Sequence, residues 1–356
     1  MRTAVEIRHE ARGALRANSG WRSTIGGWGL WLGIEYVLSA FLGVPTNPAM
    51  LIMAAASPGA LSGMMLAVLV LMAFAYYIFF VKVYGTTALA LSVVRGVPSV
   101  RYAFSGFRVG WRAVGVHFRI GWRILLPAAP GLLLLMSLLS WFSFQGPEAV
   151  EVVRHHAVLF SLGGLLMLLL AIPAVMVWYN YRMAYNVLVD HADWSGGAVV
   201  DEARRLMAGH RAVLFRVDLW FIVLSIAFFL PGTYLVFQSA MNADVANLLH
   251  EVITRQGDQA AMVSALQTLP ALRDLALGVF LLFAATIASL FWLKPLWATA
   301  HAAFYENLLD EDDARRATEE PSDGRVADGV VSENRSSGNS LPAEDRASTG
   351  DETEDQ

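Results

Sequence analysis

The sequence of 356 residues contains no cysteine. This absence excludes a disulfide, a zinc site with thiolate ligands and a cysteine nucleophile. Lysine is nearly absent as well: Lys82 and Lys294 are the only two, and the other permanently basic side chains are all arginines. Charged residues make up 16% of the chain, whereas a soluble domain carries roughly 25%. Together with a hydrophobic share of 56%, this composition favours a membrane protein.

Six long apolar runs are distributed along the chain, and five of them contain no charged residue. The first run is interrupted once, by Glu35. A helix needs about 20 apolar residues to cross the core of a bilayer, and each run reaches or nearly reaches that length. We therefore predict an all-α fold, a polytopic membrane helix bundle with six transmembrane helices. The predicted spans cover residues 24–44, 60–83, 121–143, 157–180, 215–238 and 275–298.

Basic residues alternate between the connections of these spans. Five arginines precede the first span, seven basic residues lie in 82–123 and five in 182–216, whereas 45–59 has none. Lysine and arginine collect in cytoplasmic loops, so the pattern predicts that both termini are cytoplasmic and that the membrane is the bacterial cytoplasmic (inner) membrane. Because any inner-membrane protein shows such basic loops, we expect no nucleic-acid partner.

The chain changes character at residue 310. From there to residue 356 it has 15 acidic residues and 5 arginines and no aromatic residue. Such a segment buries too little apolar surface to offset its ordering entropy, so we predict a disordered, acidic cytoplasmic tail after a six-helix transmembrane domain at 1–309. The tail is either a solubilising extension or a docking segment for a basic protein partner.

Three segments that precede the first, third and fifth spans resemble one another. Each is a short helical pattern with a glycine near its end, at Gly20, Gly110 and Gly209. We predict three pseudo-repeats, each an amphipathic helix in the membrane interface followed by a helical hairpin. Membrane lipids are the expected partners, and the arginines after these glycines are the expected contacts for lipid phosphates: Arg22, Arg112 and Arg211.

Glu35 is the one acidic residue deep within a predicted span. It lies about 18 Å from the start of that span at 1.5 Å per residue, near the middle of a core about 30 Å thick. A charge there costs roughly 3 kcal/mol and usually faces a bundle interior or a wet cavity. Glu35 is therefore either a hydrogen-bonded acid that joins helices or a functional carboxylate that couples to protons or cations.

Other polar groups and several prolines lie closer to the span ends or interrupt the spans. Asp218 is expected to form a structural bridge with Lys294 or Arg182. The prolines are expected to kink helices, or, at 126–131, to break one. The connection at 241–274 shows apolar residues at helical spacing on either side of Gly257, which predicts two short amphipathic helices.

The segments 182–190, 202–211 and 294–305 are the most specific of the chain. They resemble a bacterial family of six-span integral membrane proteins known as domain of unknown function 975. The positions that carry this resemblance are Tyr185, Asp190, Gly209, Pro295 and Tyr305. The chain is also similar, more distantly, to the membrane part that accompanies some glycerophosphodiester phosphodiesterases. The resemblance implies no catalytic residue, since the first family has none assigned and the second keeps its chemistry in a separate domain.

Motifs of common enzyme classes are not found in the sequence, which has no phosphate loop, dinucleotide-binding glycine pattern, zincin motif or nucleophile elbow. We therefore expect a protein that is not an enzyme, without catalytic, cofactor-binding or metal-binding residues and without a cofactor. Its expected role is that of a scaffold or regulator of envelope or lipid-associated partners. The alternative is a small-solute or ion-coupled transporter that uses a cavity near Glu35.

Overall fold

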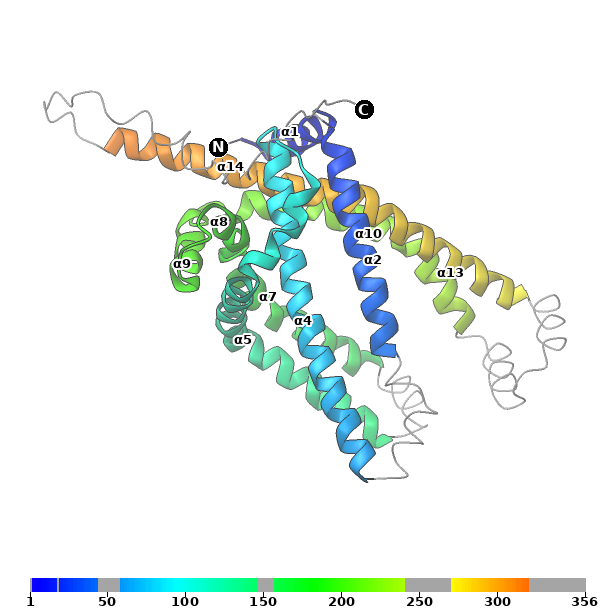
Figure 1. Ribbon diagram of the computed structural model, residues 1–356. Coiled ribbons are helices and arrows are strands. Elements are labelled where there is room, and N and C mark those ends of the chain that lie inside the picture. The colour runs from blue at the N-terminus through cyan, green and yellow to red at the C-terminus, as the bar shows by residue number, and fades with distance from the viewer. Residues whose placement is uncertain (1, 18, 44–57, 146–156, 241–269, 320–356) are drawn as a thin grey trace, which may run out of the picture. The chain divides into compact units, whose positions relative to one another are not determined.

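The computed structural model describes residues 2–17, 19–43, 58–145, 157–240 and 270–319, and within these ranges the chain is helical, with no strand (Figure 1). This confirms the all-α prediction. The helices are α1 (Ala4–Arg16), α2 (Gly20–Gly43), α4 (Pro58–Val94), η1 (Val100–Phe104), α5 (Gly106–Gln145), α7 (Ala157–Asn180), α8 (Ala184–Asp190), α9 (Gly196–Leu206), α10 (Arg211–Ala240), α13 (Pro270–Ala288), η3 (Ser289–Leu293) and α14 (Lys294–Glu319).

Five stretches within the described residues are long and apolar enough to cross a membrane. They are Met65–Val94, Gly106–Leu138, Leu162–Asp190, Arg211–Ser239 and Arg273–Thr318. The chain is therefore a multi-pass membrane protein. The remaining predicted span is helical as α2, but this helix contains Glu35 and several glycines and is not among the five.

The membrane-length helices present apolar side chains outward. Leu66, Leu126 and Leu168 are each more than half exposed, as is Phe237 near the end of α10. In water such a surface would be unfavourable, because exposed apolar area costs roughly 25 cal/mol per Å². In a bilayer these side chains contact lipid tails instead, as expected for spanning helices.

The buried core gathers where short helices pack against the ends of the long ones. Ile7, Ala11 and Leu15 form one fully buried stripe of α1, at the four-residue spacing that places side chains on one helix face. The other core residues come largely from the end of α4 and from α8, α9 and α14. This region, rather than the outer parts of the spans, carries most of the fixed side-chain packing.

The described chain divides into two units, Met1–Asp312 and Asp313–Gln356. Helix α14 continues to Glu319, so residues 310–319 of the predicted tail are helical. Residues 320–356 lie outside the described residues, as do the predicted helices of 241–269, so those two predictions stay untested.

Prolines disturb the helices less than a break at 126–131 would require. Helix α5 runs without interruption through Pro127 and Pro130, so 126–131 is not a break. Near Pro295 the helix relaxes differently: the five residues of η3 form a π-helical turn, and the Lys294 N–H bonds to the Ser289 carbonyl. Proline has no N–H to donate, and a wider turn just before it is one way a helix accommodates that loss.

The three segments of the predicted repeat do not share one local structure. Gly20 begins α2, Gly110 lies inside the continuous helix α5, and Gly209 occupies a turn between α9 and α10 with φ of +84°. Only Gly209 therefore needs the left-handed conformation that glycine adopts without strain. The layout of three interfacial helices and three hairpins stays a prediction.

Candidate functional site

Arg95, directly after α4, is the centre of a polar cluster that joins three elements. Its guanidinium donates two hydrogen bonds to Asp190 at the end of α8, of 2.7 and 2.9 Å. Its Nε donates to Glu306 of α14 at 2.8 Å. Burial disfavours the charged guanidinium, but the bonds with Asp190 and Glu306 outweigh it and raise the pKa of Arg95 above its ordinary value. Arg95 is thus a permanent cation held by two carboxylates.

Two positions of the family motif meet in this cluster. The Tyr305 hydroxyl donates to the Asp190 carboxylate at 3.0 Å, on the oxygen that also accepts from Arg95. The sequence predicted Tyr305 and Asp190 separately but missed Arg95 and Glu306. No sequence signal could pair them, because Arg95 lies 95 residues from Asp190 and 211 from Glu306.

The other three motif positions have local roles. Tyr185 is placed with its hydroxyl 3.4 Å from His117 Nδ1 on α5. Gly209 makes the positive-φ turn before α10, and Pro295 follows the π-helical turn. These residues therefore shape the chain around the Arg95 cluster without joining it.

A second ion-pair group connects α9 to α14, within the first unit. Arg205 donates to Glu202 at 2.7 Å and, through both terminal nitrogens, to Asp312 at 2.7 and 2.9 Å. The hydrogen bonds with Glu202 and Asp312 raise the pKa of Arg205 above its ordinary value. A third connection ties α1 to α14, where Asn307 donates to Glu10 at 3.2 Å. The short helices are thus fastened to α14 by charge as well as by apolar packing.

Asp218 on α10 is buried, at 1% exposure. Its carboxylate accepts from Tyr179 at 2.9 Å and from the Trp297 indole at 2.6 Å, and lies 2.6 Å from His301 Nε2. The charge of Arg182, one of the two predicted partners, interacts with this carboxylate without a direct hydrogen bond. A buried carboxylate is tolerable when donors surround it in this way. The group joins α7, α10 and α14 inside the bundle.

Glu35 is not isolated, because it forms an ion pair with Lys82, one of the two lysines of the chain. Its carboxylate accepts a hydrogen bond from Lys82 on α4 and forms an ion pair with it. Lys82 also lies 5.5 Å from the ring of Trp28, which is seven residues before Glu35 and therefore on the same face of α2. The charge of Lys294, on the neighbouring start of α14, interacts with both groups. The two lysines of the chain therefore both lie near the one acidic residue of α2.

The three arginines predicted to contact lipid differ in their surroundings. Arg22 is exposed on α2. Arg112 is exposed on α5 but donates to the Ala192 carbonyl, so its charge is partly engaged. Arg211 is half-buried at the start of α10, and its Nε is buried without a hydrogen-bond partner. Of these three arginines, Arg211 is therefore the one with a buried N–H group that has no acceptor.

Metal ligands are not grouped in the part of the chain that the structure describes, where no three His, Asp or Glu side chains could hold one ion. In a comparison with protein families, residues 1–312 match the family described as Protein of unknown function (DUF975). The chain belongs to this family. The match confirms the resemblance carried by the motif positions, whereas the likeness to the membrane part of glycerophosphodiester phosphodiesterases is not shown. No curated protein and no solved structure matches this DUF975 member.

Proposed function

We propose that this DUF975 member is a non-enzymatic, six-span protein of the bacterial cytoplasmic membrane that serves as a scaffold or regulator for envelope or lipid-associated partners. The single observation that carries the proposal is the Arg95 cluster. Its four side chains satisfy one another across α4, α8 and α14, so they hold a surface in place rather than present a free reactive group. Networks of this kind rigidify and specify one arrangement when every member is paired.

The position of this cluster supports a docking role. Helices α1, α8 and α9 are short, carry the buried core, and are fastened to α14 by Arg95, Arg205 and Asn307. We place this layer on the cytoplasmic side, where the arginine-rich segments belong by the positive-inside rule. Both termini are then cytoplasmic too, and the acidic segment 310–356 binds a basic partner on that side of the membrane.

A transporter is the second candidate, and one observation favours it. Glu35, Lys82 and Lys294 place three ionisable groups together on spanning helices of a chain that has few charges. Ionisable residues within a membrane often mark a proton or ion pathway. Against this, Glu35 is already neutralised by Lys82, and an ion pair that joins α2 to α4 also explains why both residues are there.

The test uses full-length protein in living bacteria, with a photo-crosslinking amino acid at Ser336 in the acidic segment. A scaffold predicts a discrete crosslinked protein band, identified by mass spectrometry, that disappears when the acids of 310–356 are replaced by serine and asparagine at unchanged length. The transporter hypothesis is tested in parallel by measuring proton flux into proteoliposomes with a pH-sensitive dye. Absence of any tail-dependent band, combined with proton flux that Glu35→Gln abolishes, would replace the scaffold by the transporter.

A further inference from the structure

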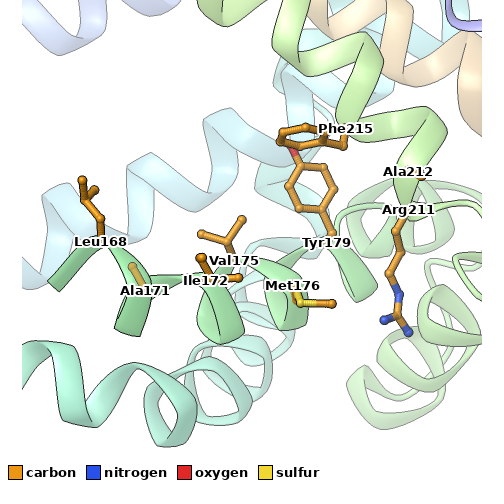
Figure 2. Close-up of a pocket in the computed structure, with 9 residues that line it drawn as sticks. All are labelled: Leu168, Ala171, Ile172, Val175, Met176, Tyr179, Arg211, Ala212 and Phe215. Atoms are coloured by element: carbon orange, nitrogen blue, oxygen red, sulfur yellow. The ribbon is translucent and has the colours of Figure 1, made fainter. Parts of the chain in front are cut away.

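An apolar groove lies between α7 and α10, with a volume of about 530 Å³. Figure 2 shows its lining, with a row of side chains from Leu168 to Tyr179 along α7 and Phe215 and Arg211 on α10. The rings of Tyr179 and Phe215 meet edge to face at 6.0 Å and close one part of the wall. Nearly all of the lining surface is hydrocarbon, and the arginine is its one charged residue.

The length of the groove matches one leaflet of a membrane. Leu168 and Tyr179 are 11 residues apart on one helix, which corresponds to about 16 Å at 1.5 Å per residue. The hydrocarbon core is about 30 Å thick, so one leaflet is about half of that. An acyl chain lying along α7 would therefore run from near the middle of the bilayer to the region of the headgroups.

The charged end of the groove has a free cation. Arg211 forms no hydrogen bond or ion pair with any residue that the structure describes, and its Nε is buried. Other arginines of the described chain are engaged: Arg123 is paired with Asp201 at 3.0 Å, and Arg182, whose Nε is likewise buried without a hydrogen-bond partner, lies over the ring of Trp178 at 4.2 Å. Because Nε is covered, the terminal nitrogens are the part of the guanidinium that a ligand reaches, and an anionic oxygen placed there accepts charge-assisted hydrogen bonds.

We propose that this groove binds one phospholipid, with an acyl chain along α7 and the phosphate on the Arg211 guanidinium. The spanning helices expose the site to lipid, and the anionic group that all phospholipids offer to a guanidinium at headgroup depth is a phosphate. A transmembrane helix of another protein would fill the apolar part but would leave Arg211 unpaired, which is costly. The site is distinct from the proposed scaffold surface and from the Arg95 cluster.

The experiment measures lipid retained by the full-length protein in detergent, by native mass spectrometry, after titration with dioleoyl phosphatidylglycerol. Dioleoylglycerol, which has the same chains and no phosphate, is the parallel probe. Arg211→Gln should lower the retained phosphatidylglycerol about tenfold at subsaturating lipid, as the loss of one charge-assisted contact predicts. Arg216→Gln is the matched control, because Arg216 is an exposed arginine of the same helix that does not line the groove.

A second variant tests the apolar part independently. Ala171→Trp fills the wall of the groove on α7 and leaves Arg211 in place, so it should reduce retention of both probes. Melting curves in lipid-free detergent check that each variant is folded, and Arg211→Lys keeps the charge if the glutamine variant does not fold. Equal retention by wild type and Arg211→Gln, an equal loss in Arg216→Gln, or equal binding of dioleoylglycerol and phosphatidylglycerol would overturn the proposal.

Discussion

The hydroxyl of Tyr305 on α14 donates a hydrogen bond of 3.0 Å to the carboxylate of Asp190, the last residue of α8. The same carboxylate oxygen accepts from Arg95 at 2.9 Å. One carboxylate therefore fixes the end of α8 against both α14 and the end of α4. The arrangement depends on three donors that reach the Asp190 carboxylate from two other elements.

Removal of Arg95 should destabilise the protein. Arg95→Met keeps much of the side-chain volume but leaves Asp190 and Glu306 without their cation, in a partly buried setting. Breaking a buried pair by removing one partner costs about 3–5 kcal/mol, and the partial exposure here reduces that to about 2 kcal/mol. The midpoint of thermal unfolding in detergent should fall by several degrees. The double variant Arg95→Met with Asp190→Asn should recover part of the loss, and an additive loss would show that the two side chains do not act together.

Asp218 should tolerate asparagine and not leucine. Asparagine keeps a carbonyl oxygen for Tyr179 or Trp297, whereas leucine leaves the Tyr179 hydroxyl without its acceptor and the Trp297 indole with His301 Nε2 alone, at 2.9 Å. An unsatisfied buried donor costs about 1–3 kcal/mol, so Asp218→Leu should lose about that much more than Asp218→Asn. The measurement is the yield of monodisperse protein on size-exclusion chromatography, followed by thermal unfolding. Equal behaviour of the two variants would contradict the role given to Asp218.

The pair of Glu35 and Lys82 should survive reversal of its charges. Lys82→Met removes the ion-pair partner of Glu35 on the apolar helix α2, which costs up to roughly 3 kcal/mol, and expression in the membrane fraction should drop. The double variant Glu35→Lys with Lys82→Glu restores an ion pair and should restore expression. If the single variant expresses normally and only the reversal fails, the carboxylate has a function that its structural pairing does not explain.

Gly85 on α4 should not accept a side chain. A Cβ at this position would overlap the backbone carbonyl of Ala103 in η1, and backbone cannot move aside as a flexible side chain can. Overpacking of this kind costs about 1–3 kcal/mol, so Gly85→Ala should lower the unfolding midpoint. The indole of Trp31 on α2 donates to that same carbonyl at 3.0 Å. Gly85→Ala should therefore also change the fluorescence of Trp31.

Gly121→Ala on α5 is the matched control for this substitution, because nothing lies within 4 Å of the added carbon. It should leave the midpoint unchanged or raise it, since alanine is favoured over glycine in a helix interior by about 0.5–1 kcal/mol. A similar loss in both variants would contradict the role given to the close approach of α4 and η1, because helix propensity alone predicts a gain.

The arrangement of polar partners shows where sequence reasoning ended. The isolated position of Glu35 in an apolar run identified it as costly, but its partner Lys82 is 47 residues away in the sequence, so no local pattern pairs the two. For Asp218 the predicted partners were basic residues, whereas the structure supplies a tyrosine, an indole and a histidine from two other helices. Any donor can satisfy a carboxylate, so residue type alone does not select among those that the fold brings near.

The sequence by itself determined the helical class, the membrane-length helices and the family, because apolar runs and short motifs are local properties of the chain. Only the tertiary structure decided that Arg95 joins Asp190 to Glu306, that α5 runs through its prolines, and that Arg211 lies at the end of an apolar groove. The physical reason is the distance along the sequence over which each property is determined. Transfer of a residue from water to lipid depends on that residue and its neighbours in sequence, whereas ion pairs and grooves depend on which distant helices pack together.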